Sequence, residues 1–324
     1  MNTTLEIKIK QAEEAEGKGE YFYAAYLYRE AMKTAKNLND GNGIALLKKK
    51  IVETHQKMQA EMQTASAETE ISGEAIIKFL ASVIDNHNIE QIFEIIGRDR
   101  GFCPQYDVIA EQAKNIPLWS IIADVTMISK DGHVIKGGND PAQMSFMQRY
   151  GLNQEIILKV YLQRLFYELM RQQNLLTEES LITHFKKSQL FPENVLKIVE
   201  VGIGRYFAED YVSALHILVP QFETLFLSVS EKIGLDVIAL EQTKEIATRT
   251  KILSAIQLDS PEFQKRWGKD FCEQLKYVLF EPLGYKLRHK VAHGEIGFEE
   301  CSFATTSLMI YLFLAVTARV KKTS

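Results

Sequence analysis

Apolar residues follow a helical spacing along most of the chain. In residues 74–96 isoleucine, leucine and valine recur every three or four positions, and residues 154–174 and 259–279 are patterned in the same way. This period places the apolar side chains on one face of a helix. Ser260 and Pro261 mark the start of the last of these helices, because serine caps a helix and proline fits its first turn. The pattern predicts an all-α protein.

One short segment departs from the helical spacing. Residues 125–129 and 133–135 are rich in valine and isoleucine, and they flank the sequence Lys130-Asp131-Gly132. Asp-Gly is a frequent turn of a β-hairpin. We therefore predict a β-pair here, with a helix followed by a loop as the alternative.

The first sixty residues are predicted to be helical. Gly19, Tyr21, Ala24, Tyr28 and Ala31 have the spacing that lets two antiparallel helices pack closely. Ala24, Tyr28 and Ala31 resemble the small-aromatic-small positions in the second helix of a tetratricopeptide repeat. Such repeats bury their faces against neighbouring repeats, and only one is found here. An ordinary helical hairpin is the alternative.

Breaks in the pattern divide the chain. Residues 61–74 are small and polar and are predicted to be a linker. We expect an N-terminal helical region in residues 1–63, a helical middle region in 74–193 and a helical bundle in 194–324. Within the middle region, Thr177 precedes two glutamates in a pattern that begins a helix.

Composition narrows the function classes. The chain has 324 residues, of which 46% are hydrophobic and 25% charged, as in a soluble globular protein. A net charge of −4 excludes a protein that coats nucleic acid through bulk charge, so any such contact must be a local patch. The three cysteines are far apart and odd in number, and the N-terminus lacks the pattern of a signal peptide. We expect a cytoplasmic protein.

One segment near the C-terminus is uncharged, as a membrane anchor would be. Residues 302–318 carry no charge and are followed by Arg319, but they include several serines and threonines. The densest apolar run, residues 308–316, is far shorter than the roughly 20 residues that a spanning helix needs. We predict a helix buried in a core or in a dimer interface, and no membrane partner.

The most informative stretch is residues 285–294, with the sequence YKLRHKVAHG. Arg288 supplies a fixed cation suited to a phosphate. His293, five positions later, is the one type of side chain whose unperturbed pKa lies near neutrality. These are the two parts needed to cleave RNA without a metal. In the simplest alternative, His293 caps the helix and Arg288 pairs with Glu281 or Glu295.

A zinc site is a further alternative for this stretch. His289 and His293 lie four positions apart on one helix face, which is a zinc-ligand spacing. No cysteine, aspartate or third histidine is near in the sequence, and the pattern His-Glu-x-x-His is absent. We therefore expect no metal.

Residues 287–294 resemble the signature of the HEPN superfamily (higher eukaryotes and prokaryotes nucleotide-binding). That signature is an arginine, a polar residue, three more positions and a histidine, late in an all-α bundle. Together with residues 211–223, the motif is similar to a bacterial family carried as a domain of unknown function within that superfamily. The likeness covers about residues 200–320 and implies a C-terminal HEPN-type bundle.

The resemblance implies a metal-independent endoribonuclease that needs no cofactor and leaves 2′,3′-cyclic phosphate and 5′-hydroxyl ends. His293 would deprotonate the ribose 2′-hydroxyl or protonate the leaving 5′-oxygen, and Arg288 would hold the phosphate. His289 stands where the family often has asparagine or aspartate, as a third catalytic residue. The implied partners are RNA, a second copy of the chain, and an antitoxin or phage-defence protein. A HEPN-like scaffold that binds a protein or nucleotide without cleavage is the alternative.

Neighbouring charges complete the predicted site. Lys286 and Lys290 are expected to bind the substrate phosphates, and Lys265, Arg266 and Lys269 could extend this patch. Glu223 either faces the motif and orients it or is an ordinary solvated carboxylate.

The helical period limits the geometry of the site. Five residues at about 100° each place Arg288 and His293 roughly 140° apart on a straight helix. We therefore expect Gly294 to end the helix at His293, and two protomers to pair their motifs in one cleft.

Overall fold

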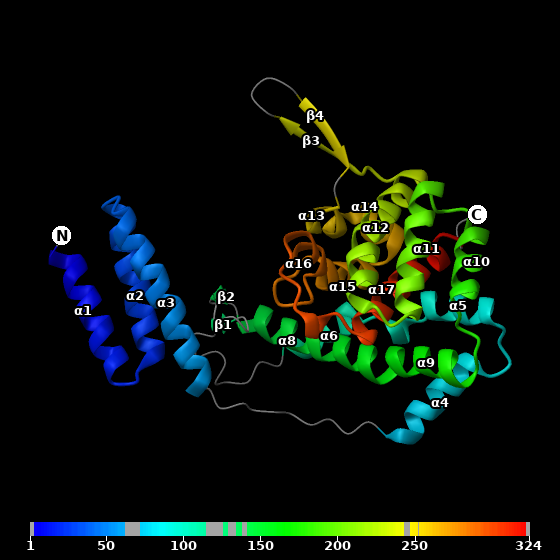
Figure 1. Cartoon of the computed structure of the whole chain (residues 1–324), viewed down its shortest axis with the longest axis horizontal. Helices are drawn as coiled ribbons and strands as arrows, with labels where there is room; N and C mark the ends of the chain where they lie inside the picture. The colour runs from blue at the N-terminus through cyan, green and yellow to red at the C-terminus, as the bar shows by residue number, and fades with distance from the viewer. Residues whose placement is uncertain are drawn as a thin grey trace. The chain divides into compact units, whose positions relative to one another are not determined.

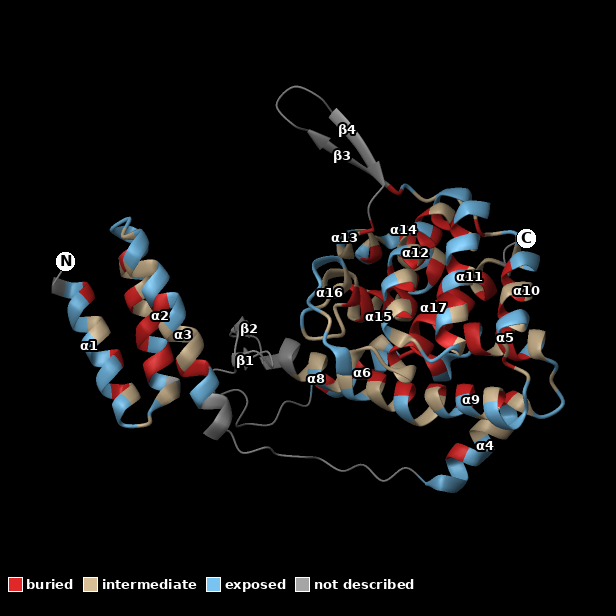
Figure 2. Ribbon diagram, viewed as in Figure 1, coloured by how far each residue is buried: buried red, intermediate tan, exposed pale blue. Residues whose placement is uncertain are grey.

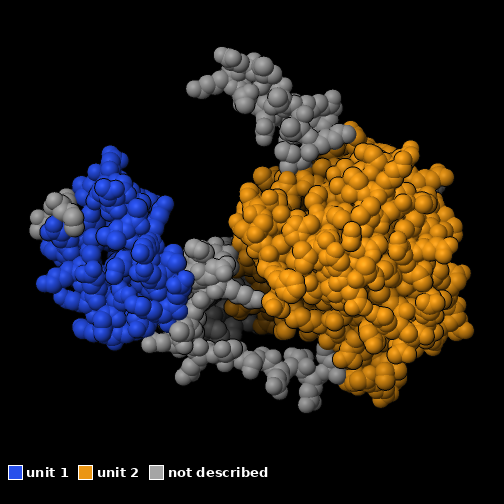
Figure 3. All heavy atoms as spheres, in the orientation of Figure 1, with its two compact units in different colours: residues 1–70, 117–141 blue, residues 71–116, 142–324 orange. Residues whose placement is uncertain are grey.

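The computed structural model describes residues 3–61, 72–114, 126–128, 134–137, 141–242, 247–251 and 253–321 (Figure 1). The predicted all-α fold is confirmed, since helices form the cores of both compact units. Unit 1 comprises residues 1–70 and 117–141, and unit 2 comprises residues 71–116 and 142–324 (Figure 3). The predicted middle region and C-terminal bundle are therefore grouped in one unit and share one core.

Unit 1 contains three helices in sequence. Ala24, Tyr28 and Ala31 are fully buried among them, which explains their small-aromatic-small spacing. Gly19 has a φ of +79° and lets the chain turn after the first helix. The Tyr28 hydroxyl donates to Glu16 over 2.8 Å. The likeness to a tetratricopeptide repeat stays a prediction. The helices are α1 (Thr3–Gly17), α2 (Tyr21–Asn37) and α3 (Gly41–Glu61).

Two antiparallel hairpins are the only sheets in the described part of the chain. The predicted β-pair is confirmed as β1 (Thr126–Ile128) and β2 (Val134–Gly137). Its expected turn at Asp131-Gly132 lies outside the described residues. The second hairpin, β3 (Ile238–Gln242) and β4 (Ala247–Lys251), was not predicted.

Unit 2 is a bundle of helices around a single core. Its first half, up to the long turn before the second hairpin, contains α4 (Gly73–Ile84), α5 (Ile89–Arg98), η1 (Arg100–Phe102), α6 (Tyr106–Ala113), α8 (Pro141–Ile156), the π-helical η2 (Ile157–Leu162), α9 (Gln163–Tyr167), the π-helical η3 (Glu168–Gln172), α10 (Glu178–Ser188), α11 (Glu193–Phe207) and α12 (Tyr211–Lys232). The second half contains α13 (Ala255–Asp259), α14 (Pro261–Trp267), α15 (Lys269–Leu279), α16 (Leu287–His293), η4 (Phe298–Glu300) and α17 (Phe303–Lys321).

Local sequence signals set several of these helix starts. Thr177 accepts a hydrogen bond from the Ser180 backbone N–H and caps α10, as predicted. Ser260 caps α14 in the same way, with Pro261 in its first turn. Both predicted helix starts are confirmed.

Helix α17 forms the centre of the core of unit 2. It is buried on every side from Thr305 to Ala318 (Figure 2), and it contacts α5, α9, α12 and η2. At Gly97 of α5 an added Cβ would lie 2.5 Å from the Ala318 Cβ and 2.7 Å from the Leu314 carbonyl oxygen. The two helices therefore touch almost at backbone distance. The predicted buried-core helix is confirmed.

Two helices are long and apolar enough to cross a membrane by length and composition. Helix α12 has half of its apolar window buried inside the protein, and α17 has 78% of its window buried. Core helices of soluble proteins pass the same test, so the two helices are weak indications of a membrane span.

Candidate active site

The motif lies on α16, a helix of only seven residues. Leu287 anchors it, with 1% of its surface exposed, and α16 contacts α12 and α15. Just before it, the Tyr285 backbone N–H donates to the Tyr277 carbonyl over 3.1 Å, and the Tyr285 hydroxyl donates to Glu155. Burial and the Glu155 charge raise the pKa of Tyr285 well above its ordinary value, so this hydroxyl stays a donor. Packing around the helix, rather than its length, fixes α16.

Gly294 ends α16 in the left-handed conformation, with a φ of +67°. The Glu295 N–H donates to the Lys290 carbonyl over 2.8 Å, and the Gly294 N–H to the Val291 carbonyl over 3.4 Å. This pair of bonds is the Schellman motif. The helix ends at His293, as the sequence predicts.

Arg288 is held by a carboxylate of α12. Its Nε donates to Glu223 Oε2 over 2.6 Å and its Nη2 to Glu223 Oε1 over 3.2 Å. Oε1 also accepts from the Leu253 backbone N–H over 3.1 Å. The guanidinium packs over the Phe280 ring at 5.5 Å. Its side chain stays 38% exposed, while that of Glu223 is 20% exposed. Of the two roles considered for Glu223, the structure places it against the motif.

The alternative pairing of Arg288 is not found. Glu295 instead lies 3.4 Å from His289 Nε2 and 3.7 Å from Lys286 Nζ, and the bonds of Arg288 go to Glu223. Among the described residues, Glu281 forms no ion pair with Arg288.

The two histidines of α16 lie side by side. The ring centroids of His289 and His293 are 4.3 Å apart, with the planes tilted by 40°. His293 is exposed and His289 is partly exposed. The structure thus brings the two imidazoles together and directs Arg288 toward α12. This agrees with the helical period, which puts positions four apart on one face and positions five apart on different faces.

The predicted substrate-binding cations are already engaged. Lys286 pairs with Glu295, and Lys290 pairs with Glu300. Lys269, the expected extension of the patch, pairs with Asp107 over 2.7 Å. A phosphate would therefore have to compete with these carboxylates.

Metal and thiol chemistry find little support in the described part of the chain. There, no three histidine, cysteine, aspartate or glutamate side chains lie together as metal ligands. Burial raises the pKa of Cys103 and of Cys272 to about 12, so both stay thiols near neutral pH.

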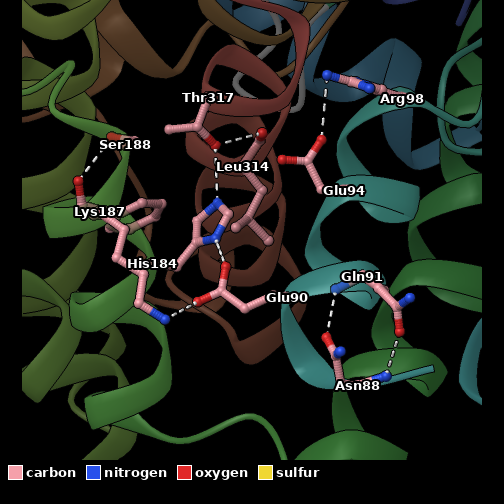
Figure 4. Close-up of polar contacts among 11 residues, drawn as sticks. Asn88, Glu90, Gln91, Glu94, Arg98, His184, Lys187, Ser188, Leu314 and Thr317 are labelled. Carbon is pink, nitrogen blue, oxygen red and sulfur yellow. Dashed lines mark hydrogen bonds and ion pairs between the residues drawn. The ribbon is translucent and has the colours of Figure 1, made fainter. Parts of the chain in front are cut away.

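A depression lies at the start of α5, away from the motif in sequence. It is lined by His87, Asn88, Glu90, Gln91, Glu94 and Ile95. Four of its polar side chains make contacts within the protein (Figure 4). Asn88 and Gln91 form the capping box of α5, and Glu94 pairs with Arg98 over 3.3 Å. Glu90 pairs with Lys187 over 3.0 Å.

Behind this depression, the buried His184 connects three helices (Figure 4). Its Nδ1 lies 2.7 Å from Glu90 Oε2, and its Nε2 lies 3.2 Å from Thr317 Oγ1. The Thr317 hydroxyl donates its hydrogen to the Leu314 carbonyl over 2.8 Å, so its oxygen accepts from His184. An ionised carboxylate also only accepts, so His184 and Glu90 form an ion pair when the imidazole is protonated. No local sequence pattern predicts this contact, because Glu90 and His184 are 94 positions apart.

Comparison with protein-family models, with curated proteins and with solved structures finds no match for this chain. The likeness to the HEPN superfamily stays a prediction that rests on the motif and its helical setting.

Proposed function

We propose that this protein is a metal-independent endoribonuclease of HEPN type, with Arg288 and His293 at its centre. The observation that carries the proposal is the cluster on α16. An exposed imidazole at a helix end lies against a second imidazole, on the same short helix as an arginine held in place by a carboxylate. Acid-base groups beside a phosphate-binding cation are what metal-free RNA cleavage needs.

Arg288 keeps the capacity to bind a phosphate while paired. A guanidinium has five N–H donors, and Glu223 accepts from two of them, at Nε and Nη2. No described residue accepts from Nη1, so the outer edge of the guanidinium can reach two phosphate oxygens. Glu223 thereby fixes the direction of the fork before the substrate arrives. Such pre-organisation lowers the entropic part of a reaction barrier.

The remaining parts of the proposal follow from the resemblance. RNA is the substrate, and the products carry 2′,3′-cyclic phosphate and 5′-hydroxyl ends. A homodimer would place two α16 helices in one cleft, with Lys286 and Lys290 available once a phosphate displaces their carboxylates. A toxin or phage-defence role in the cytoplasm, restrained by a partner protein, completes the proposal.

One observation favours a non-catalytic scaffold as the second candidate. Lys286, Arg288 and Lys290 each have a carboxylate partner within the protein. A surface whose cations are neutralised attracts RNA weakly. In that case α16 would present its histidines to a protein or nucleotide without cleavage.

The test is RNA cleavage by purified protein in EDTA. We expect the wild type to cleave and His293→Ala to be inactive. His216→Ala is the matched control, because His216 is an exposed histidine on α12 whose Nδ1 bonds only its own helix, at the Val212 carbonyl. Cleavage by wild type and H216A but not by H293A, with cyclic phosphate ends, would support the nuclease. Equal cleavage by all three, or none by the wild type, would overturn it, and RNA binding without cleavage would favour the scaffold.

A further inference from the structure

We infer that His289 is the general acid and His293 the general base of the reaction, both from the same protomer. This inference rests on the proposed function and deepens it, because a single histidine leaves one of the two proton transfers without a catalyst. The observation behind it is the 4.3 Å separation of the two imidazole rings, which lie four positions apart on one helix face.

The spacing suits the chemistry of RNA transphosphorylation. The attacking 2′-oxygen and the leaving 5′-oxygen lie in line on opposite sides of the phosphorus. They are separated by two phosphorus–oxygen bonds, so the two proton-transfer groups must lie close together, as the two rings do at 4.3 Å between centroids. Two rings side by side can each direct a nitrogen to one of these oxygens.

The carboxylate of Glu295 distinguishes the two rings. Its Oε2 lies 3.4 Å from His289 Nε2, which is an ion pair when the imidazole is protonated. Among the described residues, His293 has no carboxylate partner. Glu295 can neutralise a proton carried by His289, and no described carboxylate does so for His293, so the geometry assigns the donor role to His289. His289 is therefore the acid and His293 the base.

The backbone places Glu295 for this role. Glu295 follows Gly294 directly, and its own N–H closes the Schellman motif on the Lys290 carbonyl. The backbone of Glu295 is thus fixed relative to the last turn of α16.

The step balances without another reactant. His293 removes the proton of the 2′-hydroxyl as the 2′-oxygen bonds to phosphorus. The bond between phosphorus and the 5′-oxygen breaks, and His289 gives its proton to that oxygen. The products are a 2′,3′-cyclic phosphate and a 5′-hydroxyl, and both histidines return to their starting states by exchange with water.

Two substrates with different leaving groups test the assignment. The leaving 5′-oxygen of a dinucleotide needs a proton, whereas the leaving group in the nitrophenyl ester of uridine 3′-phosphate is stable without one. Loss of a general acid typically lowers a rate by about 100-fold or more. We expect His289→Ala to lose about that factor in kcat on the dinucleotide and only a few-fold on the ester. His293→Ala should lose activity on both.

Several outcomes would overturn the inference. Equal losses of H289A on the two substrates would show that His289 only positions the site, and no loss on either would show that it has no role. Retention of ester cleavage by H293A would reverse the roles. His289→Gln, with circular dichroism, separates these results from misfolding, because it keeps a polar side chain of similar size. A wild type that cleaves neither substrate would instead overturn the proposed function, and the inference with it.

Discussion

Replacing Glu223 by glutamine tests how the motif is held. The carboxylate accepts three hydrogen bonds, two from Arg288 and one from the Leu253 backbone. A glutamine offers one acceptor oxygen, and its amide group would then face a donor. At least one N–H loses its partner in a partly buried place, and the charge opposite Arg288 is removed.

The expected size of the effect lies between two limits. Exposed ion pairs contribute about 0–1 kcal/mol, and removing one partner of a fully buried pair costs about 3–5 kcal/mol. Glu223 is 20% exposed and Arg288 is 38% exposed, so solvent screens the pair in part. We expect Glu223→Gln to lower the free energy of unfolding by about 2 kcal/mol. A freed guanidinium should lower RNA cleavage by about 100-fold, as displaced catalytic groups do.

Urea unfolding followed by tryptophan fluorescence measures the first quantity. Trp267 is buried and packs on Phe226, one turn from Glu223, at 4.8 Å between ring centroids. A Trp119→Phe background leaves it as the only one of the two tryptophans. Glu179→Gln, at an exposed position in the first turn of α10, is the control and should change stability by less than about 0.5 kcal/mol. Equal effects of E223Q and E179Q would refute the reasoning from bond counting. Lost stability with unchanged cleavage would refute the positioning role.

Three further predictions concern the rest of the unit. Glu90→Ala should lower the free energy of unfolding by about 3 kcal/mol, because it removes the acceptor of the buried His184. His184→Leu should lower it by only about 1 kcal/mol, because Glu90 keeps its ion pair with Lys187 and Thr317 keeps its bond to the Leu314 carbonyl. Urea unfolding would show which of the two variants loses more stability, with Glu94→Ala as a control that should lose about 1 kcal/mol or less. A larger loss in H184L than in E90A would contradict the hydrogen-bond assignment. Burial raises the pKa of Glu90, but the hydrogen bonds from His184 and Lys187 outweigh this effect, so the pKa is lowered overall. The wild type should therefore lose stability as the pH falls below 4.5, and this part of the loss should be absent in Glu90→Gln. Gly294→Ala should lower the free energy of unfolding by about 1 kcal/mol through backbone strain, because Gly294 has a φ of +67° and the space around the new Cβ is open. A large loss of RNA cleavage in a variant that is still folded would indicate a displaced Glu295.

Local signals were read correctly where the chemistry is local. The starts of α10 and α14 depend on a side chain that caps its own helix, and Gly294 ends α16 through its own backbone. The burial of α17 was also predicted, because its apolar run is too short and the segment too rich in hydroxyl groups for a membrane span. Each of these features is encoded within a few consecutive residues.

Features that join distant residues were harder to predict. Arg288 and Glu223 are 65 positions apart, and two local glutamates appeared to be the simpler partners. The core that the middle region shares with the bundle was not predicted for the same reason. Leu162, Phe166 and Phe185 lie in one core with residues of α12 and α17, which no local pattern reveals. The hairpin of β3 and β4 was not predicted, because its strands mix polar and apolar residues and no Asp-Gly or Asn-Gly stands between them.

The site therefore depends on the fold more than the motif suggests. A helix of seven residues is too short to be stable alone. What fixes α16 is the burial of Leu287, the pairing of Arg288 with α12 and the ion pair between Lys290 and Glu300. Two of these contacts use residues that the motif also needs for chemistry. The carboxylates that compete with a phosphate thus also hold α16 and its histidines in position. Substitutions that free the cations should therefore lower RNA cleavage instead of raising it.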